Sequence, residues 1–199
     1  MEYAFHIYNK LAADGMLMAT EKLLQQRAVN NPTSPFSKRN DATPVIVCVG
    51  SDLAIGDSLG PIAGSMLKYK TQGNSAFIYG TLSSPVTAKE IKYLRAFLKD
   101  AHPKSPVIAV DAAVGSEGDI GLIKVLDAPL YPGAGANKRL GAIGDISILG
   151  IVAEKSVANY GLFNRTRLNL VYSMAEIVSE TLASLLWQRK GAQTGKTSG

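Results

Sequence analysis

Short apolar runs alternate with longer stretches of helical periodicity from residue 44 onward. The short runs are rich in valine and isoleucine and have the length of strands. They predict strands at 44–50, 76–80, 106–111, 120–126 and 146–152. The longer stretches repeat apolar residues at helical spacing and predict helices at 58–70, 85–100 and 168–189.

This alternation of strands and helices determines the predicted fold class. It is typical of a mostly parallel sheet with helices on both faces, because each crossover helix packs back onto the sheet. We therefore predict an α/β protein, a three-layer sandwich around a mostly parallel central sheet. Ser84 and Pro85 predict the start of the second helix, since a capping hydroxyl and a first-turn proline favour that position.

The two ends of the chain differ in pattern from its centre. Residues 5–28 have helical spacing and predict an amphipathic helix or a broken pair of helices, and the proline-containing segment 30–41 predicts a loop. We therefore predict an amino-terminal helical arm and linker over 1–43, packed outside the main sheet. The α/β domain then covers 44–190, and a disordered tail covers 191–199.

Composition narrows the class of protein. With 46% hydrophobic and 19% charged residues in 199, the chain is expected to form one globular domain. Its apolar runs are shorter than the roughly 18 residues that span a bilayer, so no membrane partner is expected. The net charge of +5 comes from scattered basic residues rather than from a cluster with aromatics, which argues against nucleic acid.

The cysteine count and the first residues predict a cellular compartment. Cys48 is the single cysteine and stands inside an apolar strand, so we interpret it as a core residue rather than a catalytic thiol. The amino terminus lacks the basic and apolar regions of a secretory signal. Both observations favour the reducing cytoplasm.

Asp57 and Asp111 are the candidate catalytic residues. Asp57 follows the strand at 44–50 in a glycine-bracketed loop, and Asp111 ends the apolar run 107–110. The carboxyl ends of parallel strands meet at one edge of a sheet, where α/β proteins place their chemistry. A strand spacing of about 4.8 Å puts the two carboxylates roughly 5 to 10 Å apart, close enough to share a water, a proton or a metal ion.

Structural roles are the alternatives for these residues. Asp57 can cap the following helix, and Asp111 can serve as a turn residue. No cofactor is expected, because His102 precedes its strand at the opposite edge of the sheet and His6 belongs to the amino-terminal arm. Both histidines are interpreted as surface residues. Weak binding of a divalent cation by the carboxylate pair and waters stays open.

A second candidate segment is the glycine-containing loop 131–139. Gly133 and Gly135 allow close approach of the backbone to a ligand, and Asn137 and Lys138 supply donors for a carbonyl or an anion. A plain surface loop is the alternative. The spacing before Lys138 does not match a nucleotide-binding P-loop.

Several ordered motifs resemble a known family. They are Val47–Pro61, Ala109–Ala112, Pro129–Lys138, Gly144–Ile146 and Asn164–Leu168. Together they are similar to the YyaC-type sporulation proteins of spore-forming Firmicutes over about residues 44–189. That family is similar to the spore germination protease and, more remotely, to hydrogenase maturation proteases, which implies a phosphorylase/hydrolase-like α/β fold.

The resemblance implies a peptidase-like hydrolase that acts on a protein or peptide, with Asp57 and Asp111 in the positions of the proposed catalytic acids. Tyr131 stands where the germination protease carries a histidine, so nickel recognition of the hydrogenase type is not implied. The alternative hypothesis is a non-catalytic peptide- or ligand-binding regulator of sporulation that uses the same cleft. The sequence leaves the oligomeric state open.

Overall fold

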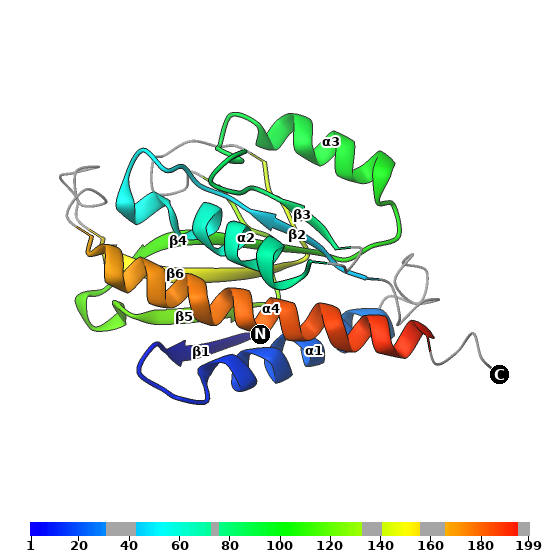
Figure 1. Ribbon diagram of the computed structural model, residues 1–199, viewed down its shortest axis with the longest axis horizontal. Coiled ribbons are helices and arrows are strands. Elements are labelled where there is room, and N and C mark those ends of the chain that lie inside the picture. Colours follow the sequence, from blue (N-terminus) through cyan, green and yellow to red (C-terminus); the bar gives the residue numbers. More distant parts are fainter. Residues whose placement is uncertain (31–42, 73–75, 133–140, 156–165, 195–199) are drawn as a thin grey trace.

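A mixed six-stranded sheet with the order β1-β5-β6-β4-β2-β3 forms the centre of the protein (Figure 1). The computed structural model describes residues 1–30, 43–72, 76–132, 141–155 and 166–194. The strands are β1 (Glu2–His6), β2 (Val45–Cys48), β3 (Phe77–Tyr79), β4 (Val107–Gly115), β5 (Leu122–Leu126) and β6 (Ile146–Glu154). The helices are α1 (Ala12–Asn30), α2 (Leu59–Lys70), α3 (Ile91–Ala101) and α4 (Leu168–Thr194), with short 3₁₀ helices η1 (Ile55–Asp57) and η2 (Glu117–Asp119).

The predicted mostly parallel sheet is confirmed. Strands β6, β4, β2 and β3 run parallel to one another, whereas β5 is antiparallel to β6 and β1 is antiparallel to β5. All four residues of β2 are buried, as expected for a central strand that is covered on both faces. The five strands expected from the apolar runs all form.

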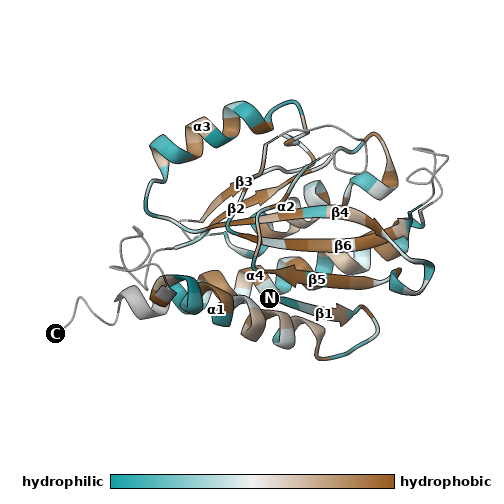
Figure 2. Ribbon diagram, turned by 180° about the vertical axis from the view of Figure 1, so that it is seen from behind, coloured by the Kyte–Doolittle hydropathy of each residue, from teal (hydrophilic) through white to brown (hydrophobic). Residues whose placement is uncertain are grey.

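Helices cover both faces of the sheet, so the three-layer arrangement is also confirmed. On one face, α1, α2 and α4 pack against side chains such as Ile46 and Val110 to form the larger apolar core. On the other face, Ile91 and Leu98 of α3 pack against Val45 and its neighbours. Figure 2 shows the strands predominantly hydrophobic in colour and α3 carrying hydrophilic segments.

The amino-terminal segment joins the sheet, so the prediction that it packs outside the sheet is wrong. Residues 2–6 form the edge strand β1, which pairs with β5 from Glu2↔Leu126 to His6↔Leu122. Tyr3 and Phe5 alternate with polar or small residues and pack against the larger core. The helical periodicity that follows belongs to α1 alone.

The second helix begins later than predicted. Ser84 and Pro85 do not start it, because α3 begins at Ile91. The intervening chain is held by the sheet instead: Val86 forms a bridge with Val49, and its carbonyl accepts a hydrogen bond from the Gly50 amide at 2.9 Å. Pairing with a strand distant in sequence thus overrides the local helix-start signal.

The last helix extends further than predicted. It starts at Leu168 as expected but continues to Thr194, so residues 191–194 are helical rather than part of a disordered tail. The remaining residues of the predicted tail, 195–199, lie outside the described residues, as does most of the predicted loop at 30–41. The domain boundaries at 43 and 190 stay predictions.

Two glycines permit unusually close contact between α2, β3 and β2. A Cβ atom on Gly64 of α2 would stand 1.9 Å from the carbonyl oxygen of Gly80. Gly80 has a φ of +92°, and a Cβ atom there would stand 1.8 Å from the carbonyl oxygen of Cys48. The helix therefore packs directly on the backbone at the carboxyl end of β3, which determines where the loop before α2 lies.

Gly64→Ala is expected to destabilise the protein by about 2 kcal/mol, because the added methyl group displaces α2 from β3 and the cost of overpacking exceeds the gain in helix propensity. Urea unfolding measures the change in free energy. Gly118→Ala is the control, since a Cβ atom there meets nothing within 4 Å. Equal stability of the two variants would contradict the contact.

Candidate active site

The loop after β2 carries Asp57 at the carboxyl edge of the parallel strands. β2 ends at Cys48, and the chain turns at Gly50, whose φ of +139° suits glycine. A Cβ atom on Gly50 would stand 2.1 Å from the carbonyl oxygen of Asp57. That carbonyl accepts a hydrogen bond from the Ser51 amide at 3.0 Å, which closes the loop.

The structure does not support a capping role for Asp57. The residue before α2 is Ser58, and its hydroxyl donates to the carbonyl of Ile55 at 2.7 Å rather than capping the helix. Asp57 is the last residue of η1. A Cβ atom on Gly60 would stand 2.0 Å from the Val49 carbonyl oxygen, so the start of α2 packs tightly against the end of β2 and holds η1 in place.

Asp111 lies inside a strand rather than at its end, which corrects the predicted strand boundary at 111. β4 continues to Gly115 beside β6, where Asp111 pairs with Leu149. β2 is shorter and stops at Cys48, opposite Val110. Asp111 is therefore the first β4 residue beyond the end of β2, and the pairing of β4 with β6 holds its backbone.

Burial dominates the electrostatics of Asp111. The residue is 8% exposed. Its pKa is raised well above the ordinary value of 3.8, first by burial and then by the nearby charge of Asp57. The hydrogen bond from the Ala112 amide to its carboxyl, at 2.8 Å, lowers the pKa but does not offset these effects. Burial and the charge of Asp57 therefore both disfavour the ionised form of Asp111.

Asp57 is less buried than Asp111, and its pKa is raised toward neutrality. Burial raises its pKa from 3.8 to about 6, and the Ser51 backbone amide opposes that shift. At pH 7 Asp57 is mostly ionised while burial disfavours the charge on Asp111. The structure thus brings together the two predicted carboxyls and gives them unlike environments, an arrangement that suits a base and an acid.

Exposed apolar side chains border this edge of the sheet. Leu53 is 92% exposed and Ile55 38% exposed on the loop that carries Asp57. Leu168 and Tyr172 are about half exposed at the start of α4, which contacts η1. Large apolar residues gathered at a surface typically mark a binding site. The border therefore offers apolar contacts beside the carboxyl pair.

The second predicted segment cannot be compared with the structure. Gly133, Gly135, Asn137 and Lys138 all lie outside the described residues. Their role in holding substrate stays a prediction. Tyr131, which precedes them, is described and is 64% exposed.

His102 does not belong to this site, as expected, but it is not a simple surface residue. Its ring lies 4.3 Å from that of Phe77, and its Nε2 is hydrogen-bonded to the Tyr79 hydroxyl at 2.7 Å. It lies before β4, at the amino edge of the parallel strands. His6, at the end of β1, accepts a hydrogen bond from the Tyr8 amide through Nδ1.

Asp145 is a partly buried acid whose role the sequence analysis did not identify. One carboxylate oxygen accepts a hydrogen bond from the Val107 amide at 2.8 Å, and the other lies 3.6 Å from the Arg27 guanidinium. Burial raises its pKa, although Val107 and Arg27 oppose that shift. Asp145 links α1 to the amino edge of β4 and β6. Its position before a strand carried no signal that separates it from a turn residue.

Metal ligands are sparse near the carboxyl pair. Across the described ranges, no group of three or more His, Cys, Asp and Glu side chains is placed to hold a metal ion. Cys48 is fully buried in the core as predicted, and burial raises its pKa to about 12. Weak binding of a divalent cation by Asp57 and Asp111 stays a prediction.

Fold and site together define an α/β protein with a coupled carboxyl pair at the carboxyl edge of a mostly parallel sheet. The chain belongs to a family of proteins described as of unknown function, DUF1256, which matches residues 17–181. It is 42% identical over 139 residues to the uncharacterized protein YyaC of Bacillus subtilis (strain 168), covering 70% of this chain and 67% of that protein. The resemblance to YyaC-type proteins is confirmed.

One solved structure is also similar to this chain. It is the crystal structure of a [NiFe] hydrogenase maturation protease, HycI, from Thermococcus kodakarensis KOD1, with a TM-score of 0.46 and 20% identity. The match covers 73% of this chain and 93% of that one. Separately, none of the helices in the described part of the chain is both long and apolar enough to cross a membrane.

Asp57→Asn is expected to stabilise the protein by about 1 to 2 kcal/mol at pH 7, less than the full shift implies because the side chain is partly solvated. The folded-state pKa is raised from 3.8 to about 6, so stability falls as the pH rises between these values. The gain should disappear below about pH 3, where the carboxyl is protonated in both the folded and the unfolded state. Urea unfolding at both pH values measures it.

The exposed residue Asp52 provides the control, and Asp52→Asn should leave the free energy of unfolding unchanged at both pH values. A gain from Asp57→Asn that is equal at about pH 3 and at pH 7 would contradict an electrostatic origin.

Proposed function

We propose that this protein is a peptide-bond hydrolase in which Asp57 and Asp111 form the catalytic pair. One observation carries the proposal: Asp57 lies close enough to raise the pKa of Asp111, and the two carboxyls differ in burial, since Asp111 is buried and Asp57 is partly solvated. A pair of this kind holds one proton and one negative charge near neutral pH. It therefore combines an acid and a base in one site.

The proposed reaction uses each carboxyl for one task. Ionised Asp57 removes a proton from a water whose oxygen attacks the scissile carbonyl carbon, and protonated Asp111 donates a hydrogen bond to the carbonyl oxygen as negative charge develops there. When the carbon–nitrogen bond breaks, the proton held by Asp57 passes to the leaving amine. Water is consumed, and both carboxyls return to their starting protonation states.

The surroundings of the pair support a polypeptide as substrate. Leu53 and Ile55 on the loop that carries Asp57, and Leu168 and Tyr172 at the start of α4, which contacts η1, are proposed to offer apolar contacts to side chains that flank the scissile bond. The loop residues Gly133, Gly135, Asn137 and Lys138 are proposed to hold the substrate backbone, as the sequence predicts. Membership of the same family as YyaC supports the further proposal that the substrate is a cytoplasmic protein of a sporulating cell.

Cleavage of peptides in an extract of sporulating cells is expected from the wild-type protein. Asp57→Asn and Asp111→Asn should each lower the rate at least about 100-fold, since general acid or base catalysis contributes that much. Mass spectrometry of released peptides measures the difference. Asp52→Asn, on the same loop, should cleave as the wild type does. Identical digests from all four proteins would overturn the hydrolase proposal and favour a binding protein.

The rate of cleavage is expected to rise with pH around a midpoint of about 6, because Asp57 must lose its proton to act as the base. It should fall again at higher pH, where Asp111 loses the proton that it donates. The residual activity of Asp111→Asn should lack this upper decline, since an amide is a weaker donor than a carboxylic acid but keeps its protons at all pH values. A rate that is constant between pH 5 and pH 7 would contradict the role of Asp57.

A further inference from the structure

The sheet ends at the edge strand β3. This strand is the last in the sheet order, and no strand of the described residues pairs with its outer side. It consists of Phe77, Ile78 and Tyr79, a sequence of high strand propensity without charge. Proteins commonly protect such edges with charged residues or a covering segment, because an exposed edge pairs readily with another chain.

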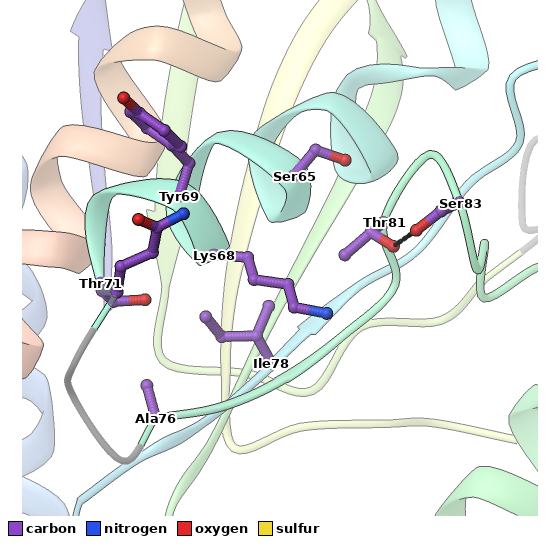
Figure 3. A pocket seen from close by; sticks show the side chains of 9 residues that line it. Ser65, Lys68, Tyr69, Thr71, Ala76, Ile78, Thr81 and Ser83 are labelled. Carbon is purple, nitrogen blue, oxygen red and sulfur yellow. Dashed lines mark hydrogen bonds between the residues drawn. The ribbon is translucent and has the colours of Figure 1, made fainter.

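A cavity of about 530 Å³ lies along this edge on the face that α2 covers. Lys68 of α2 extends beside Ile78 with its ammonium group directed away from the helix, and the hydroxyls of Thr81 and Ser83 point toward each other (Figure 3). We call this the edge cavity. It has room for side chains of a segment that lies alongside β3.

The Lys68 ammonium group provides a positive charge in the edge cavity. The Ser65 hydroxyl accepts from the Leu82 amide and donates to the Pro61 carbonyl, and the Thr81 and Ser83 hydroxyls are hydrogen-bonded to each other. Lys68, by contrast, is exposed and forms no ion pair with any carboxylate in the described part of the chain. The cavity therefore favours an acidic side chain.

The opposite face of the same edge carries exposed aromatic side chains. Phe77 is 46% exposed and Phe97 of α3 is 49% exposed. The ring of Tyr79 lies 5.8 Å from that of Phe97, and the ring of Phe77 lies 4.3 Å from that of His102. We call these four residues the aromatic platform. The aromatic platform offers apolar contacts on the face of β3 that lies opposite the edge cavity.

We infer that the outer edge of β3 is a docking site for an extended acidic segment of a polypeptide, which adds a strand to the sheet. Successive side chains of a strand point to opposite faces. An added strand would therefore direct acidic side chains toward Lys68 and apolar side chains toward the aromatic platform, while its backbone pairs with β3. The inference rests on the proposed function, because it assigns this segment to the polypeptide substrate.

The position of the edge relative to the carboxyl pair supports this assignment. β3 and β2 run parallel and end together, since the Gly80 backbone packs on the Cys48 carbonyl. An added strand would lie two strand spacings from β2, or about 10 Å. Chain that continues past the docked strand needs about three extended residues to cover that distance. The docked segment thus leads toward the edge that carries Asp57.

Charge argues for an acidic polypeptide rather than a second copy of this protein. A symmetric pairing of two β3 edges would bring the Lys68 side chains of both copies to the same face, without a carboxylate between them. The net charge of +5 adds to that repulsion. An acidic segment would instead place negative charge beside Lys68, so the repulsion would become an attraction.

Binding should be measured with the Asp57→Asn/Asp111→Asn double variant, which leaves the probe uncleaved. The probe is a fluorescein-labelled, terminally blocked eight-residue peptide that alternates glutamate and tyrosine. In fluorescence polarisation, adding Lys68→Glu should weaken its binding about five- to tenfold, as expected when an attraction becomes a repulsion. Adding Lys92→Glu, an equal charge change on the exposed side of α3, should leave binding unchanged.

A peptide with lysine in place of glutamate should show the reverse preference and bind the Lys68→Glu protein more tightly. Two further probes carry N-methyl groups on alternate residues, either the odd or the even set. Strand pairing uses the amides of one edge, so one methylated probe should lose binding and the other should keep it. Equal effects of Lys68→Glu and Lys92→Glu, or equal binding of both methylated probes, would overturn the inference.

Light scattering tests the second copy as the occupant. A dimer of the wild-type protein that competes with the peptide would overturn the inference, and a monomer that binds the peptide supports it. Failure here is distinguishable from failure of the proposed function. If the wild-type protein cleaves peptides in the extract but the double variant binds no probe, only the docking site is wrong.

Discussion

The structure of the site depends on close backbone contact where the chain leaves β2. A side chain on Gly60 would collide with the carbonyl of Val49, and one on Gly50 would collide with that of Asp57. These contacts compress the loop between strand and helix, so that η1 lies directly over the end of a central strand. Without them the loop would extend into solvent, and the carboxyl of Asp57 would neither be desolvated nor lie near Asp111.

Ionisation of the carboxyl pair destabilises the folded state. Burial of Asp111 and partial burial of Asp57 both disfavour negative charge, and the charge of Asp57 further disfavours ionisation of Asp111. The protein tolerates this cost because the surrounding core is extensive, with β2, β4 and β6 buried between helices on both faces. Carboxyls whose pKa values are raised by burial are enriched at functional sites, which makes this pair the candidate active site.

The amino and carboxyl edges of the parallel strands differ in the side chains that they carry. At the amino edge, Asp145 bonds to Val107 and lies near Arg27 of α1, which joins the helix to the sheet. At the carboxyl edge, apolar residues such as Leu53 stay exposed beside the carboxyl pair. The outer side of β3 is a third region, where an edge strand that pairs only with β2 among the described strands lies between the edge cavity and the aromatic platform.

The alternation of strands and helices after residue 44 was sufficient to predict the fold class, because strands buried on both faces leave continuous apolar runs in the sequence. The positions of Asp57 and Asp111 after two such runs were sufficient to predict that both carboxyls lie at one edge of the sheet. Tertiary structure alone decided that residues 2–6 join the sheet and that Val86 pairs with Val49. It also decided that Asp111 lies within a strand. These features depend on partners far away in the chain, which local periodicity does not encode.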